Sequence, residues 1–252
     1  MTWASVILSV AVAVAAGLVG CFAVMRRMSL ASDAMSHVAL PGIGLALVLH
    51  LNPLLGGLAA LLAGAVLVWG LERQTGISTE TVIGVVFSLA LALGSMLATG
   101  EELVEALLGA PGAPGPWELA LGLAGVAAIV AFVLTQRSRL VLALVSRDIA
   151  RTAGIAVGRL ELLYMLAFVL TVALGLRYLG VLLMGSLVII PAATAKHVAR
   201  NLHAMFAVAV GVAVASTLLA EVVAPVLHRP TGPVIITLAA AAFLGSLLVR
   251  RR

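Results

Sequence analysis

Apolar runs of about 17 to 23 residues, separated by short polar segments, repeat along the whole chain. A run of this length crosses a bilayer as an α-helix, because a helix satisfies every backbone hydrogen bond internally. Hydrophobic residues make up 63% of the chain and charged residues 10%, which excludes an ordinary soluble domain. The sequence predicts an all-α, polytopic membrane protein with eight to nine transmembrane helices in one domain, residues 1–252. The expected spans are 3–25, 33–51, 54–71, 81–99, 119–135, 160–176, 179–195, 203–223 and 233–249.

Lys and Arg residues are distributed unequally between the two predicted sides of the membrane. Thirteen of the 15 fall on one side, and only Arg177 and Arg229 fall on the other. Basic residues accumulate in cytoplasmic loops, so we expect the N-terminus outside and the C-terminus in the cytoplasm. The net charge of +5 belongs to these loops and does not indicate nucleic-acid binding. The first run is too long for a cleaved signal peptide, so we expect it to remain as a span.

The boundary at Arg177–Tyr178 leaves the number of spans open. The two predicted spans beside it are short, and a re-entrant or tilted pair of helices there would change the count. Elsewhere, an outer loop over residues 100–118 carries Glu101, Glu102 and Glu105, and we interpret them as a solvated surface that can attract a cation or a basic partner.

Two titratable residues stand near the start of the second predicted span. Asp33 and His37 are four residues apart, which places both on one helix face, one turn apart. With a rise of about 1.5 Å per residue, His37 lies roughly 15 Å beyond Arg27, near the middle of the bilayer. Ionisable groups at that depth usually face an ion path, and a carboxylate with an imidazole suits Zn²⁺ or Mn²⁺. The pair therefore predicts an ion-handling site, and Pro41 weakens the helix beside it.

Structural roles compete with this interpretation. Asp33 can cap its helix near the cytoplasmic face, and His37 can make a single hydrogen bond to another helix. Glu221 is the other acid within a predicted span and is a weaker candidate for a metal ligand. It lies about 21 residues beyond Arg200, near the outer face, where it lines an entrance or simply faces interfacial water.

The sequence lacks several motifs that are typical of enzymes and of cysteine-based metal sites. Cys21 is the only cysteine, which excludes an internal disulfide and a cysteine-based metal site. The chain has no G-x-x-x-x-G-K-[ST], so it does not hydrolyse a nucleotide by a P-loop, and no H-E-x-x-H or G-x-S-x-G supports an intramembrane hydrolase. The largest predicted cytoplasmic segment, about 140–159, contains a short helix-like stretch, 147–155, with small residues between charges. It is suited to docking a partner.

Motifs spread along the chain together resemble the integral-membrane permease subunits of zinc, manganese and chelated-iron ATP-binding-cassette (ABC) importers, with the zinc-uptake branch most similar. Each motif is weak by itself, but they occur in the order of that family over nearly the whole chain. The outer loop departs from the family, because it is rich in Pro and Gly over Pro111–Pro116. The motifs are Arg26-Arg27-Met28-Ser29, Asp33-Ala34-x-Ser36-His37-x-x-Leu40-Pro41-Gly42, Ser78-Thr79-Glu80-Thr81-x-Ile83-Gly84-Val85, Asp148-x-Ala150-x-x-x-Gly154-Ile155, Gly180-Val181-Leu182-Leu183, Leu187-Val188-Ile189-Ile190-Pro191-Ala192-Ala193-Thr194-Ala195 and Pro230-Thr231-Gly232-Pro233.

The resemblance implies a homodimer of permeases in the inner membrane of a bacterium, surrounded by lipid. It implies two copies of a separate cytoplasmic ATP-binding subunit and an extracytoplasmic metal-binding protein that delivers the ion. Asp33 and His37 are similar to the metal-coordinating pair of the family. The coupling helix that contacts the ATP-binding subunit is matched by Asp148, Ala150, Gly154 and Ile155.

The sequence thus favours a transport subunit, not an enzyme, that passes zinc, or alternatively manganese or iron, by alternating access. Zn²⁺ or Mn²⁺ is then a transported substrate, and we expect no permanently bound cofactor. Two rivals remain: a proton-coupled secondary carrier in which Asp33 and His37 relay protons, and a membrane scaffold without transport. One carboxylate and one imidazole do not identify the metal.

Overall fold

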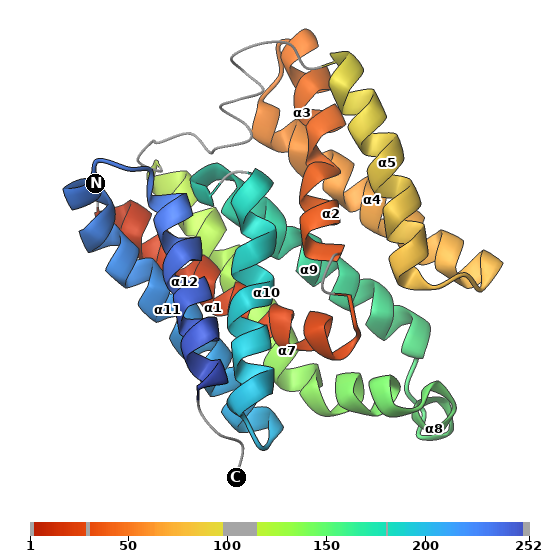
Figure 1. Cartoon of the computed structure of the whole chain (residues 1–252). Helices are drawn as coiled ribbons and strands as arrows, with labels where there is room; N and C mark the ends of the chain where they lie inside the picture. The colour runs from red at the N-terminus through yellow and green to blue at the C-terminus, as the bar shows by residue number, and fades with distance from the viewer. Residues whose placement is uncertain (1–2, 29–30, 98–114, 180, 249–252) are drawn as a thin grey trace.

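The computed structural model describes residues 3–28, 31–97, 115–179 and 181–248, and within these ranges every regular element is a helix. The predicted acids Glu101, Glu102 and Glu105 and the Pro-rich stretch up to residue 114 lie outside the described residues. Figure 1 shows the helices packed into one bundle, with α2 to α5 on one side of α10 and α11 and α12 on the other. The helices are α1 Trp3–Met25, α2 Ala31–His37, α3 Ala39–Val48, α4 Pro53–Thr75, α5 Thr79–Leu97, α7 Pro116–Val145, α8 Arg147–Thr152, α9 Val157–Leu179, α10 Val181–Val198, α11 Leu202–Leu227 and α12 Thr231–Leu247.

Seven candidate membrane spans are long and apolar enough to cross a bilayer, counted over the described part of the chain. One of them joins α2 and α3 as Ala31–Val48, and α12 is a shorter apolar helix of 17 residues. The all-helical membrane fold is confirmed, while the total of eight to nine spans stays a prediction. The predicted break at Arg177 is displaced, since α9 continues to Leu179 before α10 begins at Val181.

The predicted span over residues 33–51 is present as the candidate span Ala31–Val48, and a break at Val38 divides it into α2 and α3. The Val38 N–H bonds to the Met35 carbonyl at 3.1 Å, and α3 then starts at Ala39. Pro41 explains the division: it has no N–H for the His37 carbonyl, and its ring would collide with that carbonyl in a continuous helix. Two short helices therefore replace one long helix where the ion site is expected.

The first span forms the centre of the bundle. α1 is the most buried of the candidate spans, and small residues line it where it meets α10 and α11. A Cβ added at Gly17 would lie 3.0 Å from the Val210 backbone nitrogen of α11, and one added at Gly20 would overlap the Val188 carbonyl of α10. Without a hydrophobic force between helices in lipid, such backbone approach supplies the dispersion contacts that hold spans together.

Helix α7 extends into the predicted cytoplasmic segment 140–159. α7 passes through Arg137 and Arg139 and continues to Val145, because Leu140 and Ala143 remain buried against the bundle. Charges at a membrane boundary do not end a helix, so α7 has 30 residues. The rest of the segment contains α8 and the start of α9.

Candidate functional site

The short helix α2 carries both predicted ion ligands. Asp33 is exposed on the surface of the chain, while His37, the last residue of α2, is half-buried. A close contact with α10 holds the helix in place: Ser32 Oγ donates to the Gly185 carbonyl at 3.2 Å, and a Cβ at Gly185 would lie 2.7 Å from Asp33 Cα. The spacing of the pair is therefore kept on one helix turn that is fixed against a neighbouring span.

The imidazole of His37 packs against an aromatic ring, but one of its ring nitrogens has no hydrogen-bond partner. Its ring lies against Phe87 of α5, with 5.6 Å between the ring centroids. Its Nδ1 atom is buried and has no hydrogen-bond partner in the structure. Buried polar atoms are nearly always paired, so an orphaned ring nitrogen favours a ligand role over a purely structural hydrogen bond. The Nδ1 atom is also a chemically suitable donor for a divalent metal ion.

The structure does not bring the third candidate to this pair. Glu221 lies on α11, which Figure 1 places on the far side of α10 from α2. Within the described residues, no group of three or more His, Cys, Asp or Glu side chains is arranged to hold a metal ion. The Oε2 atom of Glu221 is nonetheless buried without a partner, so this carboxylate remains a separate candidate on its own helix.

The predicted coupling residues lie on α8 and the turn that follows it, at the edge of the molecule (Figure 1). Ser146 caps α8, its Oγ accepting from the Ile149 N–H at 3.3 Å. Asp148 is exposed, whereas Ala150 is fully buried and Ile155 is half-buried against the core. The exposed surface of the segment includes Asp148, Gly154 and Ile149, which is 55% exposed and which sequence reasoning did not single out.

Gly154 has a clear conformational role at the end of α8. The Ile155 N–H bonds to the Ala150 carbonyl and the Gly154 N–H to the Arg151 carbonyl, both at 3.0 Å, and Gly154 has a φ of 77°. This is the Schellman arrangement, in which glycine is favoured because a Cβ is disfavoured at positive φ. The glycine thus fixes the direction of the chain leaving α8.

Replacing Gly154 by alanine is expected to cost about 1 kcal/mol and to lower the thermal unfolding midpoint by about 2 to 4 °C. Asparagine, which tolerates positive φ better, should cost less. The same change at Gly84, a helical glycine of α5 with open space around it, is the control and should not lower the midpoint. Thermal unfolding in detergent measures all three; equal midpoints for Gly154→Ala and Gly84→Ala would contradict the conformational role.

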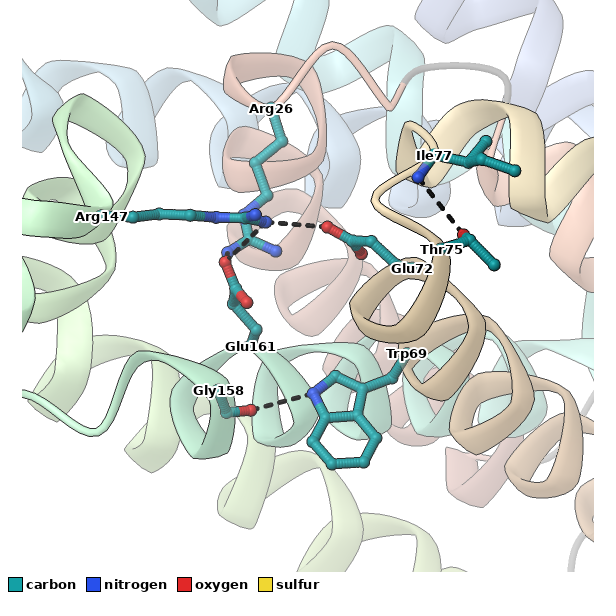
Figure 2. A network of polar contacts seen from close by, with 8 residues as sticks. All are labelled: Arg26, Trp69, Glu72, Thr75, Ile77, Arg147, Gly158 and Glu161. Carbon is teal, nitrogen blue, oxygen red and sulfur yellow. Dashed lines mark hydrogen bonds and ion pairs between the residues drawn. The ribbon is translucent and has the colours of Figure 1, made fainter.

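A cluster of four charged residues joins α8 to the bundle, and sequence reasoning missed it. Figure 2 shows Arg147 and Arg26 meeting the carboxylates of Glu161 and Glu72. Arg147 Nη2 lies 2.7 Å from Glu72 Oε1 and 2.9 Å from Glu161 Oε1, and Arg26 Nη2 lies 3.7 Å from Glu161 Oε1. The hydrogen bond to Glu72, aided by both carboxylates, raises the pKa of Arg147 above its ordinary value.

One sequence signal points to this cluster. Glu72 and Glu161 are acids placed at the ends of apolar runs, on the side where the basic residues gather. The ends of α1 and α4 and the starts of α8 and α9 meet at this cluster. The structure thus confirms that these segments share one end of the molecule, as the distribution of basic residues predicts.

Known membrane transport proteins are similar to this chain over nearly its whole length. The ABC 3 transport family matches residues 1–250. The chain is 29% identical to the high-affinity zinc uptake system membrane protein ZnuB of Haemophilus influenzae, covering 92% of this chain and 91% of that protein. It is 30% identical to the manganese import system permease protein ScaB of Streptococcus parasanguinis, covering 97% and 89%. A solved structure, PsaBC from Streptococcus pneumoniae in complex with Fab, superimposes with a TM-score of 0.83 at 27% identity, over 97% of this chain and 90% of that one. The chain belongs to the ABC 3 transport family.

Proposed function

We propose that this protein is the permease subunit of an ABC importer that moves a divalent metal ion across the inner membrane of a bacterium. The observation that carries the proposal is the match to a transport family over residues 1–250. Relatives named as a zinc uptake system membrane protein and a manganese import system permease protein agree with it. ATP binding and hydrolysis would occur on a separate subunit and would shift the permease between inward and outward access.

The transported ion would contact Asp33 and His37. Support comes from the buried, unpartnered Nδ1 of His37 and from the position of both side chains on one turn of α2. One chain supplies two donors, whereas a tight zinc site has four. Weak coordination suits a substrate that must leave, and the exposed Asp33 leaves room for donors from a second copy of the chain in a homodimer.

Partner proteins would bind at the two membrane faces. Two copies of a cytoplasmic ATP-binding subunit would dock on α8, where Asp148 and Ile149 are exposed on a helix held to the bundle by its first residue, Arg147. An extracytoplasmic metal-binding protein would deliver the ion at the opposite face. This arrangement follows from the predicted orientation, with the N-terminus outside and the C-terminus in the cytoplasm.

Zinc is our first choice of metal, with manganese and iron as alternatives. Identities of 29% to a zinc uptake system membrane protein and 30% to a manganese import system permease protein do not separate the two metals. A carboxylate and an imidazole bind either ion, so metal availability and the geometry of the assembled site decide.

The proposal is tested in proteoliposomes that contain the chain, the ATP-binding subunit and the binding protein. We expect ⁶⁵Zn²⁺ or ⁵⁴Mn²⁺ uptake that requires ATP and falls to background without the binding protein. Uptake driven by a proton gradient in the absence of ATP would instead support a secondary carrier. If the partners assemble and neither condition gives uptake, the chain is a scaffold and the proposal fails.

A further inference from the structure

The two carboxylates of the charged cluster at the start of α8 connect it to different helices. Arg147 is the first residue of α8, and one of its nitrogens, Nη2, contacts both carboxylates. Glu72 belongs to α4, whereas Glu161 belongs to α9 and also pairs with Arg26 at the end of α1. Glu161 is therefore the residue through which α8 is connected to α1.

Three of the four charged side chains in the cluster are largely buried. The side chains of Arg26, Glu161 and Glu72 are 16%, 12% and 17% exposed, whereas that of Arg147 is 53% exposed. Partly buried pairs are screened little by salt, and removing one partner leaves a charge without compensation. The cluster therefore fixes the start of α8 relative to the ends of three spans.

Arg26 is held on its other side as well. Its guanidinium lies over the Tyr164 ring, 5.0 Å from the centroid, and the Tyr164 hydroxyl donates to the Val19 carbonyl of α1 at 3.1 Å. Directly after Arg26, α1 ends in a Schellman arrangement: the Met28 N–H bonds to the Ala23 carbonyl at 2.9 Å, and Arg27 has a φ of 60°. The chain therefore leaves α1 in a fixed direction.

The next helix along the chain is the one that carries the metal candidates. α2 begins at Ala31, and Asp33 follows Arg26 by seven residues. Glu72 lies farther from α2 along the chain, because it stands near the C-terminal end of α4 and the whole of α3 and most of α4 separate it from α2. The Ala31 N–H, at the start of α2, bonds to the Met28 carbonyl at 3.1 Å, so a displacement of α8 that passes through Glu161 to Arg26 can reach α2 through this contact.

We propose that the Arg147–Glu161–Arg26 chain of ion pairs links the coupling helix α8 to the metal helix α2, with Glu161 as the positioning residue. The proposal rests on the function proposed above, since it assigns how ATP hydrolysis on a docked subunit reaches the ion path. Glu72 anchors the same arginine to α4 but stands outside this link. The link transmits movement and takes no part in binding the ion.

The test compares Glu161→Gln with Glu72→Gln, because both remove one carboxylate from the same Arg147 nitrogen. The assembled importer is reconstituted, and zinc uptake and ATP hydrolysis are measured together. We expect Glu161→Gln to keep hydrolysing ATP while the zinc moved per ATP falls by about tenfold. Glu72→Gln, although it removes the shorter contact, should change that ratio by less than about twofold.

Further variants keep the test decisive. Arg26→Gln cuts the same link from the other side and should uncouple like Glu161→Gln, which covers the case in which Glu161→Gln does not fold. Arg147→Lys should retain coupling, because a single ammonium can replace the one nitrogen that makes both contacts. Arg139→Gln is the control: this exposed arginine near the same end bonds only Gln136 of its own helix, at 3.0 Å, among the described contacts.

Two results would overturn the link. One is an unchanged ratio of zinc to ATP in both Glu161→Gln and Arg26→Gln; the other is equal uncoupling by Glu72→Gln, which would mean that the cluster only stabilises the fold. Wild-type vesicles that take up no metal would defeat the proposed function instead. The two failures are therefore distinguishable in the same experiment.

Discussion

Replacing Asp33 or His37 by alanine is expected to lower metal uptake by about 100-fold or more, because each change removes a donor that would contact the ion itself. ATP hydrolysis and assembly with the ATP-binding subunit should persist, since α2 is held in place by Ser32 and Gly185 and not by these side chains. Uptake of ⁶⁵Zn²⁺ and ⁵⁴Mn²⁺ at matched membrane expression is the measurement. The double variant should be no worse than the lower single one, because both act on one site.

Ser36→Ala is the matched control for this prediction. Ser36 lies between the two candidates on the same helix, and its Oγ donates to the Asp33 carbonyl at 2.7 Å, so its loss perturbs α2 without removing an ion donor. Uptake by Ser36→Ala should stay within about threefold of wild type. Normal uptake in both alanine variants would make the pair structural, and Glu221→Gln would then test the other unpartnered carboxylate.

The spans were predictable because each apolar run indicates a helix by itself, whatever the rest of the chain does. The sequence predicted that the helix of the second span is weakened, but not where it divides. Pro41 predicts a weakened helix, but the break falls earlier in the chain, at Val38. The reason is that Pro41 cannot donate a hydrogen bond to the carbonyl four residues before it, and its ring would collide with that carbonyl. The length of α7 was not visible in the sequence, because the helix continues past the predicted span and Arg139, and Leu140 beyond it is buried.

The sequence predicted the spacing of the two candidate ligands, but not the residues that surround them. The separation of Asp33 and His37 sets their shared helix face, but the exposure of one and the orphaned nitrogen of the other depend on α5 and α10. The ion pairs of Arg147 were hidden for the same reason, because Glu72 lies 75 residues away in the chain. Contacts of that kind depend on how helices pack, and local sequence patterns do not encode them.

Replacing Gly20 by leucine is expected to cost about 3 kcal/mol or more and to leave little folded protein in the membrane. Even a Cβ at this position would overlap the Val188 carbonyl of α10 and lie 3.2 Å from the Ala192 Cβ. Backbone atoms cannot move aside as a flexible side chain can, so α1 and α10 would have to separate. α1 is the central span, and its displacement would disturb the packing of α11 and α12 as well.

Gly70→Leu provides the comparison, because Gly70 is a helical glycine of α4 with nothing within 4 Å of its missing Cβ. That variant should unfold at the wild-type temperature or slightly above it, since glycine is a poor helix former. Fluorescence-detected size exclusion after heating measures both variants in detergent. Equal stability of the two would mean that α1 and α10 do not approach closely at Gly20. The same separation would move Gly185 of α10 away from Asp33, so a partly folded Gly20→Leu protein should also lose metal uptake.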